Sequence, residues 1–182
     1  PTREALSPGG QHHSNSDLYN MPLFAPFAHS LVGPAVGGAM GALDIVLEEL
    51  SQRKSVANIQ LSQQQSVQMR VAEATAEIEA ARAILSTDRR KILEGARNRI
   101  VPDYEQRVKY RLNAGYAAKL AVQAVERLLP LSGGRGLETT HPLQRAWRDV
   151  HAVAQHIALV WDVQALNYGS VRMGYSAMDP RI

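Results

Sequence analysis

The chain has 182 residues, of which 45% are hydrophobic and 5% aromatic, enough for one domain with an ordinary core. The absence of cysteine excludes disulfides and thiolate metal sites, and is compatible with the cytoplasmic location that we expect. A net charge of +3, with basic residues interspersed among acidic ones, gives little support to nucleic-acid binding. The longest apolar stretch, residues 35–43, is interrupted by glycines and too short to cross a membrane, so neither nucleic acid nor membrane is expected as a partner.

Residues 1–20 are rich in Pro, Gly, Ser, Asn and His and have almost no apolar periodicity, which predicts a linker or lead-in segment. The adjacent His12 and His13 point in different directions on most backbones, so we interpret them as surface residues and not as a metal site. The first residue is Pro1, and no apolar run of a signal peptide follows it. We therefore expect a fragment of a longer protein, in which residues 21–182 form the folded domain.

Three helices are predicted before residue 130. A short bent piece with three prolines leads into a helix over residues 33–53, a second helix covers 62–99, and a third begins near Pro102, a residue suited to the first helical turn. Each has an apolar stripe at spacings of three and four. Glycines in the first helix weaken it, and close approach of another helix or of a flat ligand would compensate. These glycines are Gly33, Gly37, Gly38 and Gly41.

Residues 141–175 predict a fourth and longest helix, with Thr140 as its cap and Pro142 in its first turn. Both tryptophans of the chain lie on its apolar stripe. The stripe consists of Leu143, Trp147, Val150, Ala154, Ile157, Trp161, Gln164, Tyr168 and Val171. Because no strand is indicated and the links are short, we predict an all-α fold, a four-helix up-down bundle.

Two places on this chain can carry chemistry. A flank of the last helix holds Arg145, Asp149 and His156, for which a surface salt bridge and a packed histidine are the ordinary interpretations. The glycine-rich residues 132–136 leave backbone N–H groups open beside a helix start, which can bind an anion or simply form a turn. The sequence has no P-loop, dinucleotide fingerprint or HExxH, and no Glu-x-x-His pair of the kind used by di-iron bundles, so we expect no metal site.

The run HPLQRAWRD (141–149), preceded by Gly133 and Gly134 and followed by His156, resembles the C-terminal helical domain of the acyl-CoA dehydrogenase superfamily. The resemblance extends over residues 18–174 and includes the LYNMPL entry and the AEIEAAR run. More narrowly, the chain resembles the branch of two-component flavin-dependent monooxygenases within this superfamily. Dehydrogenases of the superfamily carry a catalytic glutamate about two turns after the Arg-Asp pair, whereas residues 150–161 contain no carboxylate and His156 matches the histidine of the monooxygenases.

This resemblance implies that the chain is the last third of an oxygenase that uses reduced FMN or FAD, supplied by a separate reductase, to hydroxylate an aromatic or polyketide-like substrate. His156 is the implied catalytic residue, either hydrogen-bonded to a flavin hydroperoxide or deprotonating the substrate. Gly133, Gly134, Arg135 and Arg145 are assigned to the flavin and Trp161 to the substrate. Dehydrogenases have a glutamine ahead of the glycine loop, where this chain has Pro130.

The resemblance also implies a homotetramer assembled through this bundle, with the glycine loop meeting the flavin of a neighbouring subunit. Two alternatives stay open at this point. The chain could be the C-terminal domain of an acyl-CoA dehydrogenase, or a helical oligomerisation module without catalysis.

Overall fold

The computed structural model describes residues 16–21, 24–55 and 58–179, and the histidine pair 12–13 lies outside these ranges. The described residues form five α-helices and three short 3-10 helices, and contain no strand beyond an isolated bridge between Lys54 and Gln60. The α-helices are α1 (Phe24–Gln52), α2 (Gln65–Arg97), α3 (Tyr104–Leu128), α4 (Pro142–Ala154) and α5 (Trp161–Arg172). The 3-10 helices are η3 (Asp17–Asn20), η4 (Leu61–Gln63) and η5 (Leu129–Leu137). The all-α expectation is confirmed.

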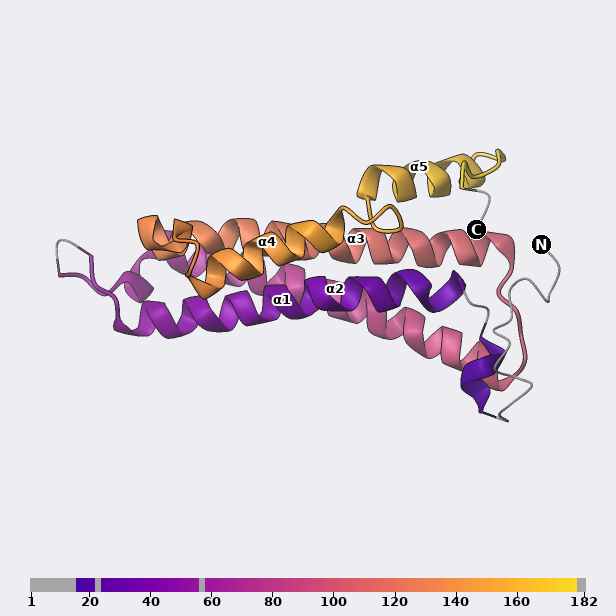
Figure 1. Ribbon diagram of the computed structural model, residues 1–182, viewed down its shortest axis with the longest axis horizontal. Coiled ribbons are helices and arrows are strands. Elements are labelled where there is room, and N and C mark those ends of the chain that lie inside the picture. Colours follow the sequence, from indigo (N-terminus) through magenta and orange to yellow (C-terminus); the bar gives the residue numbers. More distant parts are fainter. Residues whose placement is uncertain (1–15, 22–23, 56–57, 180–182) are drawn as a thin grey trace.

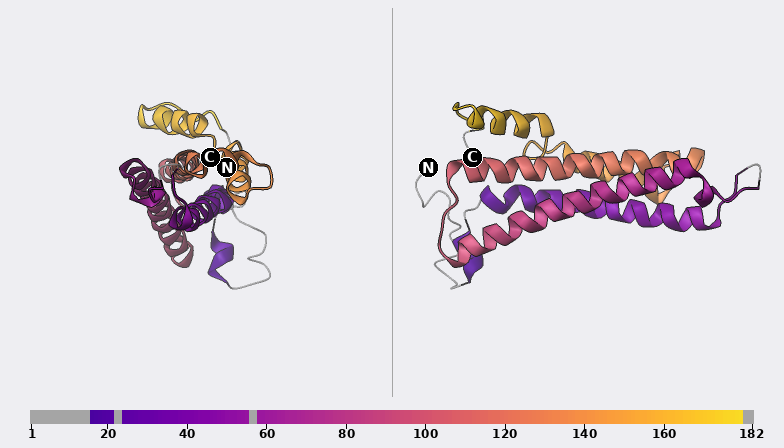
Figure 2. Two further views of the ribbon diagram at one scale, coloured as in Figure 1. Left: turned by 90° about the vertical axis from the view of Figure 1, so that its left-hand side faces the viewer. Right: turned by 180° about the vertical axis from the view of Figure 1, so that it is seen from behind.

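The helices form an elongated bundle in which each of the first four runs opposite to the one before it (Figure 1). Helices α1 to α4 enclose one core, and α5 packs on α3 outside the other helices, as the end-on view shows (Figure 2). The prediction of a fourth long helix is therefore wrong. The segment forms two shorter helices, α4 and α5, and only α4 joins the bundle.

Alanine and valine dominate the core, which lets the helix axes approach closely. Gly38 of α1 has the same purpose, because a Cβ there would lie 2.9 Å from Cγ2 of Val150 on α4. Around Gly33, Gly37 and Gly41 the space is open instead. The compensation by helix packing that we expected thus holds for one of the four glycines of α1.

Three predicted helix starts need correction. Helix α1 begins at Phe24 and passes through Pro34, whereas we expected a bent piece up to residue 33. Asp103 caps α3 by accepting the N–H of Gln106 at 2.8 Å, so Pro102 precedes the helix. His141, and not Thr140, caps α4 through Nδ1, which accepts the N–H of Leu143 at 3.2 Å.

Residues 155–160 interrupt the predicted last helix. Gln155 ends α4, and the carbonyl oxygen of His156 accepts the N–H groups of Leu159 and Val160 in a tight turn. The turn buries Ala158 and Leu159 and leaves Ile157 about half exposed, the reverse of what an unbroken helix would require. The turn can lie against α3 because residue 115 is a glycine: a Cβ there would lie only 3.3 Å from the carbonyl oxygen of Leu159.

Residues Pro26–Gln52 are long and apolar enough, by length and composition alone, to span a membrane. The same helix contributes Val32, Ala39 and Val46 to the core shared with α3 and α4, where each is almost completely buried. Its apolar character therefore has a structural use within the bundle.

Candidate functional site

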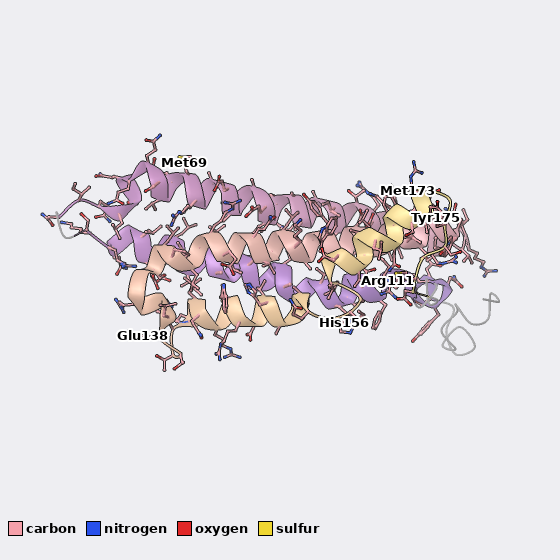
Figure 3. All side chains as sticks on the ribbon, turned by 90° about the horizontal axis from the view of Figure 1, so that it is seen from above. Met69, Arg111, Glu138, His156, Met173 and Tyr175 are labelled. Carbon is pink, nitrogen blue, oxygen red and sulfur yellow. The ribbon has the colours of Figure 1, made fainter. Side chains whose placement is uncertain are left out.

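The two candidate regions lie at opposite ends of α4. The glycine loop, residues 132–136 within η5, precedes the helix, and the His156 turn, residues 155–160, follows it. Figure 3 shows this separation, with Glu138 near one end of α4 and His156 at the other. A helix of 13 residues is about 20 Å long at 1.5 Å per residue. The structure therefore does not bring the two regions together within one chain.

His156 is exposed on its turn, and one ring nitrogen is already used. Its Nδ1 accepts the N–H of Ala158 at 3.1 Å. In the neutral imidazole the proton must then be on Nε2, which becomes a hydrogen-bond donor. The ring also meets Phe27 of α1 edge to face, with centroids 6.1 Å apart. The local turn fixes the tautomer and Phe27 supports one side of the ring.

A buried cation lies behind Phe27. The guanidinium carbon of Arg111, a residue of α3 that is only 5% exposed, is 5.9 Å from the centroid of the Phe27 ring. Figure 3 places Arg111 and His156 in the same half of the molecule. Phe27 and Arg111 are not part of the site predicted from the sequence, and no local motif points to them, because α1, α3 and the His156 turn meet only after folding.

Arg145 and Asp149 form an exposed i,i+4 ion pair, with Nε and Oδ2 3.6 Å apart. Arg145 lies near the start of α4 and His156 beyond its end, so almost the whole helix separates them. The expected flank of Arg145, Asp149 and His156 is therefore not one site, and the surface salt bridge is the arrangement observed.

Trp161 opens α5 and packs against α3. Its ring lies 5.2 Å from that of Tyr116, centroid to centroid, and the ammonium of Lys119 lies 4.9 Å from its centroid. Contacts of this kind contribute about 0.5–1 kcal/mol at exposed sites. Trp161 thus follows the His156 turn directly and anchors its far side on α3.

The glycine loop combines an open backbone with a nearby cation. Gly133 has φ of +63°, a conformation that strongly favours glycine, and Gly134 has no neighbour within 4 Å of an added Cβ. Gly133, Gly134 and Arg135 are all exposed. The guanidinium of Arg53, the residue directly after α1, comes within 3.4 Å of a Cβ built on Gly133 and donates to the carbonyl of Leu131. An anion could be held here by two arginines, in the space that the glycines leave beside the backbone.

A buried polar network holds the first turns of α1, next to Phe27. The carboxylate of Asp88 on α2 accepts from Nδ2 of Asn113 at 2.8 Å and faces Nε2 of His29 at 3.1 Å. Burial raises the pKa of the neighbouring Tyr110 hydroxyl above its ordinary value, and Asp88 and Asp103 raise it further by charge repulsion. No group of three or more metal-ligating side chains occurs within the described ranges.

The model of the acyl-CoA dehydrogenase C-terminal domain matches residues 29–161, and the chain belongs to this family. The match covers α1 from residue 29 onward, α2 to α4, the glycine loop and the His156 turn.

Among curated proteins, the chain is 34% identical over 177 residues to the oxygenase component of the FADH2-dependent resorcinol hydroxylase of Rhizobium sp., with 92% of this chain and 43% of that protein covered. It is 29% identical over 174 residues to the oxygenase component of the p-hydroxyphenylacetate 3-hydroxylase of Acinetobacter baumannii, covering 94% of this chain and 41% of that protein. The chain thus spans less than half the length of these relatives.

Among solved structures, the 3-HSA hydroxylase from Rhodococcus sp. RHA1 superposes with a TM-score of 0.88 at 26% identity, over 99% of this chain and 48% of that one. XiaF from Streptomyces sp., solved with FADH2 and glycerol, superposes with a TM-score of 0.89 at 21% identity, over 100% of this chain and 45% of that one. The second likeness concerns the fold alone.

Proposed function

We propose that this chain is the C-terminal helical part of a flavin-dependent monooxygenase that hydroxylates a phenolic or related aromatic substrate. The observation that carries the proposal is His156, an exposed imidazole on the turn after α4, in a stretch 150–161 without any carboxylate. The names of the most similar relatives, hydroxylase oxygenase components, support the same reaction. Without a carboxylate, this turn has no strong base to remove the proton next to a thioester carbonyl, which disfavours the dehydrogenase.

The reduced flavin, FMN or FAD, would supply the activation of O₂. The contribution of this chain is to place a proton donor at the reacting oxygen. Because Nδ1 of His156 accepts from Ala158, Nε2–H points its hydrogen bond away from the turn. This arrangement favours hydrogen-bond donation over removal of the substrate proton as the role of His156. Phe27 and Trp161 flank the turn from α1 and α5 and offer aromatic surface to an aromatic substrate.

The glycine loop suits the phosphate end of the flavin. Its open backbone at Gly133 and Gly134 and the cations Arg53 and Arg135 fit a phosphate by charge and by the space left around Gly134. Because α4 separates them, His156 and the glycine loop of one chain can contact the same flavin only if the cofactor is long enough to bridge both. A neighbouring subunit of a homotetramer would therefore supply one of the two regions to each flavin. Arg145, paired with Asp149, would join the flavin site only by leaving this pair.

In this proposal residues 1–20 connect the bundle to the preceding part of the oxygenase, and residues 21–182 form the domain. A separate reductase delivers the flavin, and the enzyme works in the cytoplasm. The phrase "oxygenase component" in the names of the relatives supports the reductase as partner.

The test uses the full-length oxygenase with chemically reduced FMN or FAD, O₂ and a panel of phenols. We expect a hydroxylated product that carries ¹⁸O from ¹⁸O₂, and no product under anaerobic conditions. Oxidation of acyl-CoA thioesters would establish the dehydrogenase alternative. Failure to bind any flavin would favour the oligomerisation module.

A further inference from the structure

We propose that Glu49 is a positioning residue that holds the glycine loop in the shape needed to bind the flavin phosphate. The inference rests on the proposed function of that loop. Glu49 lies in the last turns of α1, and both of its carboxylate oxygens are used. Oε2 accepts the hydroxyl of Ser132 at 2.6 Å, and Oε1 lies 2.8 Å from Nε2 of His141.

The two partners bracket the loop. Ser132 directly precedes Gly133, the residue with positive φ, and His141 caps α4 after the loop. Because Nδ1 of His141 accepts the N–H of Leu143, its Nε2 carries the proton and donates it to Glu49. Ser132 is almost fully buried, so its hydroxyl has little access to water as a substitute partner. One carboxylate thus ties both ends of the loop to α1.

Arg53, one turn after Glu49, completes the clamp. Its Nη1 donates to the carbonyl of Leu131 at 3.2 Å and lies 3.8 Å from Oε2 of Glu49. Glu49 therefore also orients the cation that lies beside Gly133. The negative charge of Glu49 is offset by Arg53 and by the hydrogen bonds, so it need not repel an anion bound on the loop.

Such a clamp is needed because of the loop composition. Three of the five residues 132–136 are glycine, and glycine loses more conformational freedom on ordering than any other residue. A loop without side-chain anchors would meet this entropic cost each time a phosphate binds. If Glu49 orders the loop beforehand, the cost falls on folding and not on binding.

The variants are chosen to separate geometry from charge. Glu49→Ala removes both hydrogen bonds. Glu49→Gln keeps them, because the amide oxygen accepts from His141 and the amide N–H₂ donates to the hydroxyl of Ser132. The matched control is Glu48→Ala, which removes an exposed carboxylate from the same turn. A fourth variant, Gly134→Leu, places a side chain in the space beside the loop, where an added Cβ has no neighbour within 4 Å, and so tests the phosphate site itself.

Two measurements are made on the full-length oxygenase: hydrogen exchange of amides 132–136 and anaerobic titration with reduced FMN and FAD. We expect Glu49→Ala to speed exchange in the loop and raise the flavin Kd about tenfold, the entropic cost of ordering about one loop residue on binding. The rate of hydroxylation at saturating flavin should change little. Glu49→Gln and Glu48→Ala should resemble the wild type in both measurements.

The outcomes distinguish the two proposals. Unchanged exchange in Glu49→Ala overturns the clamp, and so does faster exchange with an unchanged Kd while Gly134→Leu weakens flavin binding. A Glu49→Gln variant as weak as Glu49→Ala shows that charge and not loop geometry matters, which also overturns the positioning role. If Gly134→Leu leaves the Kd unchanged, the loop is not the phosphate site, and the proposed function of the loop fails together with this inference.

Discussion

The two ends of α4 are built in different ways. Before the helix, the glycine loop is held by side chains distant in sequence, such as the Glu49–Ser132 pair, which are 83 residues apart. After the helix, the His156 turn uses its own hydrogen bonds and close packing against α3 at Gly115. The difference reflects what each region offers a ligand. Open backbone requires glycines, which have no side chains to anchor them, whereas an exposed imidazole can be placed by packing and hydrogen bonds within its own turn.

The largest effect is expected at the packed end of α4, which is the His156 turn. In His156→Ala, hydroxylation should fall by ~100- to 10,000-fold, the usual contribution of a positioned acid or base. The substituted side chain is exposed but accepts the N–H of Ala158, so the free energy of unfolding should fall by no more than about 1 kcal/mol, and the flavin Kd should stay near that of the wild type.

The matched control for this substitution is Gln155→Ala, a change at the exposed neighbour on the same turn. Single-turnover hydroxylation, started by mixing the reduced enzyme with O₂, is the measurement of choice because it is independent of the reductase. Equal rates in the wild type and His156→Ala would remove His156 from the mechanism and leave this end of α4 with a structural role only.

The sequence predicted the existence and order of α1, α2 and α3, though not the residue at which α1 begins, because their apolar periods continue without interruption. It failed at residues 155–160 because this stretch contains neither Gly nor Pro and keeps the helical spacing from Val150 to Trp161. The break is visible only in tertiary contacts. Gly115 leaves room for the side chain of Gln164, which donates from Nε2 to the carbonyl of Ile157 at 2.8 Å. That bond satisfies a carbonyl which the broken helix leaves free.

For the candidate site, a local motif could point to His156 and to the loop at Gly133, since both lie beside a recognisable box in the sequence. It could not point to Glu49, Phe27 or Arg111. These residues lie on helices α1 and α3, at positions with ordinary helical composition, and their relevance depends on which helices become neighbours. The same limit explains why Arg145 was grouped with His156, because an unbroken helix would have kept them on one flank.

A substitution at Gly115 should disturb the His156 turn, with an intermediate effect on stability and activity. A Cβ there would lie 3.1 Å from Cγ of Gln164 and 3.3 Å from the carbonyl oxygen of Leu159. Gly115→Val should therefore lower the free energy of unfolding by about 1–3 kcal/mol through overpacking. Because the strain falls on the turn that holds His156, hydroxylation should fall as well, while flavin phosphate binding at the other end is retained.

The control for helix propensity is Gly37→Ala, at a helix-interior glycine with open space around it. It should raise the free energy of unfolding by about 0.5–1 kcal/mol. Chemical denaturation gives both values. A Gly115→Val variant as stable and active as the wild type would show that the turn can move away from α3 without consequence, and the contrast between the two ends would then be lost.

The smallest effect concerns the polar network behind Phe27, which extends the packed end along α1. Tyr110 faces His29 with ring centroids 6.0 Å apart, and its raised pKa means that the native state keeps the hydroxyl protonated above the ordinary value of about 10. Between pH 10 and the higher pKa of Tyr110 in the native state, the unfolded chain binds fewer protons than the native one. The free energy of unfolding therefore falls as pH rises through this range. Below pH 10 the contribution is fully present, and Tyr110→Phe should change the free energy of unfolding by no more than about 1 kcal/mol there.

Above pH 10 the variant should lose stability less steeply than the wild type, as measured by urea denaturation across the alkaline range. Parallel curves would mean that Tyr110 does not couple its ionisation to the fold, and that the first turns of α1 are held by the Asp88 hydrogen bonds alone.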